Sequence, residues 1–269
     1  MGGDGLIVER GDAITVLTLD RPRRLNALSH GLVRALHAAL DELAADLAQQ
    51  VVLLVGAGRG FCAGTDLKDQ AAGARWTEGV GEVQAAYAMQ EAVASLVLKL
   101  RRIPQPVIAV VHGVAAGGGL SLACAADLRI AEPTASFSAA FVKLGVSGGD
   151  LGSSWLLPRI VGFDRAAELL YTGRTVDAAE AERIGLVSRC VAQGTGLDAA
   201  HELAQQITKL APFSTRMTKS LLNLSRDGMT LEQLIEYENR TQILMTQTDD
   251  FAEGVRAFTE RRPATFTDQ

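Results

Sequence analysis

The sequence predicts an α/β fold followed by a helical C-terminal region. Two observations support this prediction. Apolar strand-like segments alternate with amphipathic helical patterns up to about residue 196, and helical patterns dominate from Leu197 onward. We therefore expect a core at residues 1–196 and a helical region at residues 197–269, suited to packing on the core or on a neighbouring subunit, with no Gly-, Pro- or Ser-rich linker between them.

The first elements follow from hydrophobic periodicity. Residues 6–10 and 13–19 are apolar or alternate around Gly11-Asp12, which predicts a β-hairpin. Ser29 is placed to cap a helix, because leucines recur after it every three or four residues. These leucines are Leu32, Leu36, Leu40, Leu43 and Leu47. The apolar run at residues 51–55 then predicts a buried strand.

The later elements follow in the same way. Residues 82–100 are expected to form a helix that ends before Pro104 and Pro106. A strand at 107–111, a helix of small residues at 120–126 and a short strand at 128–131 come next. Four further helices are predicted in the C-terminal region, at residues 199–210, 215–224, 231–246 and 251–260.

Composition excludes several classes of protein. The chain of 269 residues carries a net charge of −5 and has no long run of Lys and Arg, which argues against nucleic-acid binding. Its three cysteines are far apart and form no CxxC pair, so we expect no metal site. No apolar stretch approaches the roughly 20 residues that a membrane span needs. A cytoplasmic protein is therefore expected.

Two glycine-rich segments each follow a predicted buried strand. The first glycine segment is residues 61–67 (FCAGTDL), and the second is residues 112–120 (HGVAAGGGL). Two such turns can direct two backbone N–H groups toward one point, which is the geometry that holds a negatively charged oxygen. An alternative for the three glycines at residues 117–119, when they are considered alone, is that they only let a helix begin close against a strand. Residues 56–60 (GAGRG) do not complete a dinucleotide-binding fingerprint.

Together these motifs resemble the enoyl-CoA hydratase/isomerase (crotonase) family along nearly the whole chain. The matching segments are residues 19–22, 26–28, 60–67, 112–119, 127–131, 169–173, 178–181 and 184–187. The resemblance implies a crotonase (ClpP-like) spiral of ββα repeats, with a helical C-terminal part that builds a homotrimer or hexamer. It also implies an acyl-CoA substrate, whose coenzyme A moiety is the only cofactor-like group required.

The resemblance also implies roles for individual residues. The backbone amides of Thr65 and Gly118 would form an oxyanion hole for the thioester carbonyl. Six residues would lie along coenzyme A: Arg24, Leu25, Ala27, Ala63, Asp66 and Leu67. Phe258, with Arg261 or Arg262, resembles family residues that help to close the coenzyme A site.

The chain departs from the family at both positions where hydratases carry a catalytic glutamate. Ser121 and Phe141 occupy these positions, and neither side chain can act as a carboxylate base. Asp150 matches, after a one-residue insertion, an aspartate that related isomerases use as acid and base. We therefore predict that Asp150 moves the proton. The alternative is that Asp150 caps a helix at residues 151–160.

These residues predict an enzyme that stabilises a thioester enolate and uses one carboxylate as proton shuttle, which favours double-bond isomerisation. Three alternatives remain open: hydration with a non-standard base, nucleophilic attack by Asp150, and a non-catalytic acyl-CoA-binding protein. Trp76 and Tyr87 are candidates for the acyl end of the site. Cys62 and His112 are interpreted as structural residues, and Glu78, Glu82 and Glu91 as solvated charges.

Overall fold

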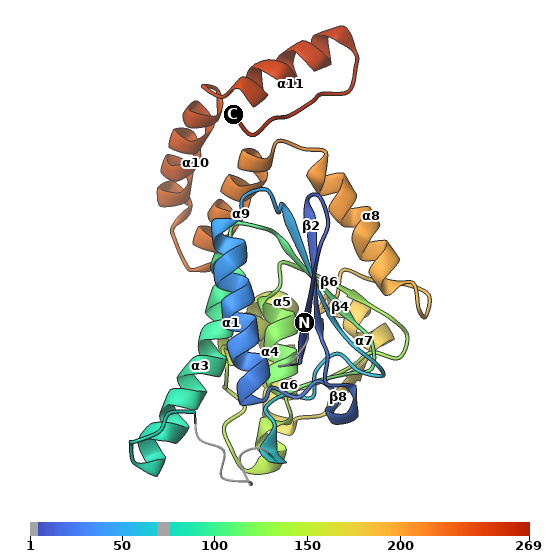
Figure 1. The fold of residues 1–269 in the computed structure, drawn as a ribbon, viewed down its shortest axis with the longest axis vertical. Helices are drawn as coiled ribbons and strands as arrows, with labels where there is room; N and C mark the ends of the chain where they lie inside the picture. Colours follow the sequence, from blue (N-terminus) through green and yellow to red (C-terminus); the bar gives the residue numbers. More distant parts are fainter. Residues whose placement is uncertain (1–4, 69–75) are drawn as a thin grey trace.

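The computed structural model describes residues 5–68 and 76–269, which fold around a six-stranded sheet. Figure 1 shows helices on both sides of this sheet. Its strands are β1 (Leu6–Arg10), β2 (Ile14–Leu19), β3 (Val51–Gly56), β4 (Val107–Val111), β6 (Leu128–Ala131) and β9 (Arg189–Cys190), in the order β1-β2-β3-β4-β6-β9. The β1–β2 pair is antiparallel, which confirms the predicted hairpin, and the other pairs are parallel. A second sheet contains β5 (Val114–Ala116), β7 (Ser136–Ser138) and β8 (Thr175–Asp177).

The central sheet is covered on both faces, and β3 shows how. Val52 and Leu54 belong to the large hydrophobic cluster on one face. Val51, Leu53 and Val55 belong to a second cluster on the other face. Successive strand residues point to opposite faces, so a strand covered on both sides needs an unbroken apolar sequence. This explains why the run at residues 51–55 does not alternate.

Helices α1 (His30–Ala45), α3 (Glu82–Arg102) and α4 (Gly118–Ala125) contribute to the large cluster. The Ser29 hydroxyl accepts a hydrogen bond from Leu32 N (3.2 Å), which confirms Ser29 as the N-cap of α1. The expected apolar face was one turn too long, because α1 ends at Ala45 and Leu47 lies beyond it with 47% of its surface exposed. The helix predicted at 120–126 begins two residues earlier, at Gly118.

Helix α8 (Gly196–Thr208) packs on the opposite face of the sheet (Figure 1). Its Ala200 and Ala204 are fully buried in the second cluster. Small side chains at these positions let the helix approach the strands closely. The start of the region expected at 197–269 therefore covers the core sheet, and the division of the chain after residue 196 stays a prediction.

The other helices among the described residues are η1 (Pro22–Arg24), η2 (Ala140–Leu144), α5 (Ser153–Val161), α6 (Phe163–Thr172), α7 (Ala178–Arg183), α9 (Pro212–Arg226), α10 (Leu231–Met245) and α11 (Asp249–Glu260). The three last helices confirm the helical C-terminal prediction.

Buried Lys219 anchors α9, because its ammonium group lies 2.9 Å from Asp127 Oδ2 and donates to the carbonyls of Gln105 (2.8 Å) and Leu100 (3.2 Å). Beyond this anchor, α10 and α11 project away from the sheet (Figure 1). Among the described helices, none has the length and apolarity to cross a membrane.

Glu253 on α11 holds the C-terminal tail and gives the tail a pH dependence. The hydrogen bonds from Arg262 and from Thr265 N lower the pKa of Glu253 to about 2, from an ordinary value of 4.5. A carboxylate with a lowered pKa stabilises the folded state fully above its unfolded-state pKa, and the contribution disappears as pH falls through the folded value. We therefore expect the difference in tail stability between wild type and Glu253→Gln to shrink between about pH 4.5 and 2. Amide hydrogen exchange of a C-terminal peptide would measure this difference, and a constant difference would contradict the prediction.

Candidate active site

The first glycine segment lies between two other parts of the chain. Cys62 N donates to the Val114 carbonyl (2.9 Å), and the Cys62 carbonyl accepts from Ala116 N (3.0 Å), which joins the segment to β5. On its other side the Gly64 carbonyl accepts from Leu28 N (2.8 Å). These backbone hydrogen bonds fix the first glycine segment against the second and against the loop before α1.

Two glycines make the close approach of these segments possible. Gly64 has φ +92°, and a Cβ there would lie 2.8 Å from the Ala116 carbonyl and 3.1 Å from Gly118 N. Gly117 has φ +53° and ψ −120°, a conformation that a side chain would strain, and it is the N-cap of α4. The sequence therefore uses glycine where the two turns touch.

Thr65 and Gly118 line one cavity of about 670 Å³. Neither backbone amide donates a hydrogen bond to another residue in the described parts of the chain. Gly118 is the first residue of α4, where the amide has no intrahelical acceptor and the helix dipole favours negative charge. The cavity therefore has two backbone donors that have no partner among the described residues, one from each of the two predicted segments.

The cavity wall is mostly apolar. Its side chains come from the first glycine segment, α3, η2 and the loop before α5: Ala63, Thr65, Leu67, Gln90, Ala140, Phe141, Leu144, Val146, Ser147 and Asp150. Asp150 is the single carboxylate among the described lining residues. Among the described lining residues, Asp150 is therefore the candidate for proton transfer by a carboxylate.

Asp150 is held by its own loop and by α3. Its Oδ1 accepts hydrogen bonds from Gln90 Nε2 (2.5 Å) and from Leu151 N (2.8 Å). Helix α5 begins at Ser153 with Gly152 as its N-cap, and no side chain caps it. The alternative that Asp150 caps this helix is therefore wrong, because the chain turns through Leu151 and Gly152 before the helix begins.

The two positions that match hydratase glutamates have different surroundings. Ser121 is fully buried in α4, and its hydroxyl is 3.5 Å from the Asp150 carbonyl, so it lies behind the loop and does not line the cavity. Phe141 lines the cavity, and its ring lies against Gly117. The Ser121 side chain therefore has no access to the cavity, and the Phe141 side chain contributes an aromatic ring to its wall.

The residues predicted along coenzyme A divide into two groups. Ala63 and Leu67 line the cavity with Thr65, Gly118 and Asp150. The other four do not line the cavity: Arg24, Leu25, Ala27 and Asp66. The roles of all six residues stay predictions.

The second group differs in accessibility. Arg24 is exposed at the end of η1, whereas Ala27 is buried. Asp66 has 4% of its surface exposed and pairs with Arg21 (2.8 Å). This ion pair ties the loop that carries Arg21 to the first glycine segment.

Asn26, which the sequence marked only as part of a matching segment, fastens the loops beneath the site. It is fully buried, its Oδ1 accepts from Arg21 N (2.8 Å), and its Nδ2 donates to the carbonyls of Ala57 (2.9 Å) and Gly60 (2.7 Å). Its φ is +56°, a conformation that Asn tolerates better than most residues. The Asn26 side chain therefore supplies the hydrogen bonds that join its own loop to the loop at residues 57–60.

Replacing Asn26 with alanine should destabilise the protein by about 2–3 kcal/mol, because three buried polar groups lose their partner. The melting temperature should fall by about 4–12 °C for a domain of this size. Asn26→Asp keeps the acceptor but turns both donors into a carboxylate oxygen that faces two carbonyls, so it should also destabilise. A calorimetric midpoint unchanged in both variants would contradict this role.

Four other candidates are placed outside the reacting centre. Burial raises the pKa of Cys62 to about 12, which keeps it a thiol, and the His112 ring bonds the Gly58 carbonyl (3.0 Å). Both interpretations as structural residues agree with these contacts. Trp76 packs on α1 beneath Arg34 (4.5 Å from guanidinium carbon to ring centre), and Tyr87 is exposed. Neither aromatic residue lines the cavity, so the expectation that they form its acyl end is not met.

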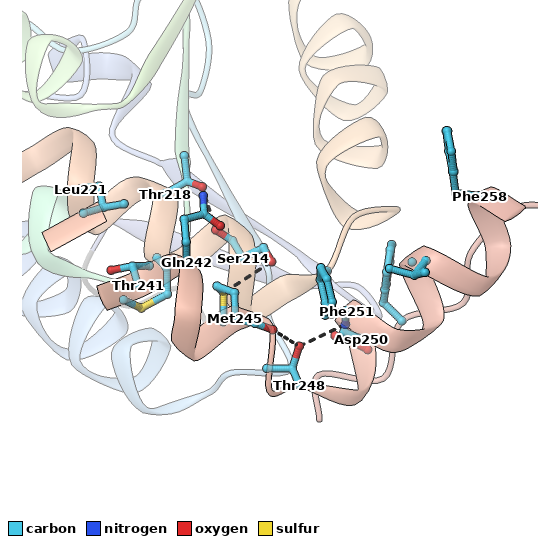
Figure 2. Close-up of a pocket in the computed structure, with 15 residues that line it drawn as sticks. Ser214, Thr218, Leu221, Thr241, Gln242, Met245, Thr248, Asp250, Phe251 and Phe258 are labelled. Atoms are coloured by element: carbon cyan, nitrogen blue, oxygen red, sulfur yellow. Dashed lines mark hydrogen bonds between the residues drawn. The ribbon is translucent and has the colours of Figure 1, made fainter. Parts of the chain in front are cut away.

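A second cavity of about 480 Å³ lies among α9, α10, α11 and the tail (Figure 2). Phe258 extends from the far part of α11 with 86% of its surface exposed, and Arg262 is engaged by Glu253 and Glu260. The two cavities share no lining residue. Within one chain, Phe258 therefore does not close the cavity that contains Thr65.

Known proteins share this fold and sequence. The family model for enoyl-CoA hydratase/isomerase matches residues 9–269. A probable enoyl-CoA hydratase of Mycobacterium leprae is 39% identical over 256 residues, covering 95% of this chain and 87% of that protein. The 1,2-epoxyphenylacetyl-CoA isomerase of Escherichia coli is 36% identical over 261 residues, covering 97% and 96%. An enoyl-CoA hydratase from Bacillus anthracis, solved by crystallography, superimposes with a TM-score of 0.91 at 32% identity, covering 98% of this chain and 100% of that chain. The chain therefore belongs to the enoyl-CoA hydratase/isomerase family and has the crotonase fold.

Proposed function

We propose that this enzyme isomerises an acyl-CoA through a thioester enolate, with coenzyme A entering as part of the substrate. The backbone amides of Thr65 and Gly118 bind the enolate oxygen, and Asp150 moves the proton. The observation that carries this proposal is the common cavity, whose described lining has two amides without described partners and one carboxylate. A single carboxylate suits a reaction in which one proton leaves and returns.

The chemistry follows from where charge develops. When Asp150 removes a proton next to the thioester, the C–H electron pair moves into the enolate and most of the charge appears on oxygen. Donors fixed for that oxygen stabilise the transition state more than the ground state. The same carboxyl group then returns the proton at a second carbon of the acyl chain, which moves the double bond.

Hydration is less well supported than isomerisation. The family's hydratases use two glutamates to hold and activate water, and Ser121 and Phe141 occupy those positions here. Ser121 is sealed behind the Asp150 loop, and Phe141 makes the wall apolar. This wall favours an apolar or aromatic acyl group over water. The similarity to a protein named as an epoxyphenylacetyl-CoA isomerase is consistent with this choice.

The C-terminal helices support self-association, and we propose a homotrimer or hexamer. Helix α10 contains no buried residue, and α10 and α11 expose several large apolar side chains: Leu231, Ile235, Ile243, Leu244, Phe251, Val255 and Phe258. Exposed apolar surface of this extent marks a site of protein association. Light scattering coupled to gel filtration would give the mass of the assembly.

The function is tested by following the acyl chain directly. Wild-type enzyme would be incubated in heavy water with 3-enoyl-CoA thioesters of different chain length and with an aromatic analogue. We expect double-bond migration, seen as ultraviolet absorbance of the conjugated thioester. Mass spectrometry should show deuterium at the acyl carbons in those turnovers in which the Asp150 carboxyl exchanges its proton with solvent before returning it. Binding of every thioester without migration, exchange or hydration would contradict the proposal and identify an acyl-CoA-binding protein.

A further inference from the structure

We propose that Gln90 is a positioning residue that orients the Asp150 carboxylate, so that Oδ2 is the oxygen that exchanges the proton with the acyl chain. This inference rests on the proposed function and adds a residue to it that no sequence motif identified. Gln90 comes from the middle of α3, 60 positions before Asp150 in the chain. Both side chains line the same cavity.

The hydrogen bonds to Asp150 are distributed unequally between its two oxygens. Gln90 Nε2 and Leu151 N both donate to Oδ1, at 2.5 and 2.8 Å. Oδ2 has no hydrogen-bond partner in the described parts of the chain. A carboxylate whose one oxygen is saturated by donors accepts a proton at the other, so these contacts select Oδ2 for the reaction.

The backbone of the Asp150 loop is held by other contacts. Ser153 Oγ accepts from Asp150 N (3.2 Å) and donates to the Gly148 carbonyl (2.8 Å), and Ser153 N donates to the Asp150 carbonyl (2.9 Å). The loop therefore has its own supports apart from Gln90. The Gln90 amide adds a hydrogen bond from a second direction, which fixes the rotation of the Asp150 carboxylate. Leu151 N cannot fix this rotation alone, because it belongs to the adjacent residue.

This orientation matters in both halves of the reaction. In the first, a C–H bond of the acyl chain breaks, an O–H bond forms at Oδ2, and the electron pair passes into the enolate. In the second, the O–H bond breaks and a C–H bond forms at another carbon. The carboxyl group must keep Oδ2 toward the acyl chain between the two steps, and a donor on Oδ1 does so without competing for the proton. Misplacement of a reacting group by about 1 Å can cost a factor of about 10² in rate.

The test compares Gln90→Met, which keeps the length of the side chain and removes its donor, with Gln84→Met on the same helix. Gln84 is exposed and lies outside the cavity lining, so it is a matched control. We expect Gln90→Met to lower kcat and the rate of acyl proton exchange by the same factor of about 10–100, with KM changed less than about twofold. Gln90→His, which offers a ring N–H of similar reach, should recover part of the loss.

The outcomes separate this inference from the proposed function. If Asp150→Asn loses turnover but Gln90→Met keeps wild-type kcat, the function stands and the role of Gln90 is overturned. A higher KM at unchanged kcat would also overturn it, because it would make Gln90 a substrate contact. If Asp150→Asn itself keeps turnover, the proposed function fails first. Should Gln90→Met fail to fold, Gln90→Leu, which also removes the donor, gives the same comparison.

Discussion

Replacing Asp150 with asparagine is expected to lower kcat by a factor of about 10²–10⁴, the usual contribution of a positioned acid–base group. An amide cannot take a proton from carbon, yet the asparagine oxygen can still accept from Gln90 and Leu151. The fold and the cavity should therefore persist, so the loss reports chemistry. Steady-state rates of double-bond migration would measure it.

Two accompanying measurements make this result specific. Calorimetric titration with a non-reactive acyl-CoA thioester should give the same affinity for wild type and Asp150→Asn, because the oxyanion donors and the walls are unchanged. Asp164→Asn, an exposed aspartate on α6 outside the cavity lining, should leave kcat unaltered. Full activity in Asp150→Asn would place the acid–base group elsewhere and remove the central element of the proposed mechanism.

Gly64→Ala is expected to lower kcat by about 10²–10³, equivalent to the loss of one oxyanion donor. The added methyl group would lie 2.8 Å from the Ala116 carbonyl and 3.1 Å from Gly118 N, in the contact between the two glycine segments. To accommodate it the segments must separate, which moves the Thr65 and Gly118 amides apart. The positive φ of Gly64 adds strain for any side chain.

Thr65→Ala is the control for this variant, because it alters the side chain at the donor residue and leaves the backbone N–H in place. Its kcat should stay within a few-fold of wild type. Circular dichroism of both variants would show that the sheet is intact. Equal, large losses in both variants would show that the Thr65 hydroxyl takes part, and no loss in Gly64→Ala would mean that the amide spacing does not matter for turnover.

The sequence was sufficient where a residue's role depends on its near neighbours. The apolar run of β3, the Ser29 cap and the glycines of the two segments were all recognisable, because burial on both faces, capping and tight turns each restrict residue type locally. The short strands β5, β7 and β8 were missed. Three residues carry too little periodicity to be detected, and these strands exist only because they pair with one another.

Contacts between distant segments set the limit of the sequence analysis. The bond between Gln90 and Asp150 joins a surface position of α3 to a loop, and no spacing rule relates them. Trp76 and Tyr87 were expected at the cavity because they lie near a segment that covers the acyl pocket in the resembled family, whereas packing on α1 and exposure to solvent place them elsewhere. In the sequence Asp150 directly precedes an apolar helical pattern, and residue types do not reveal the turn through Leu151 and Gly152 that separates it from α5.

The anion-binding atoms proposed here belong to the main chain, which has a consequence for how such an enzyme diversifies. A point mutation cannot delete a peptide N–H unless it introduces proline. The two anion-binding amides are therefore retained while the surrounding side chains change. New reactions can then arise by exchanging side chains such as Ser121, Phe141 and Asp150 over an inherited scaffold. One ancestral way of holding an acyl thioester can in this manner serve many catalytic outcomes.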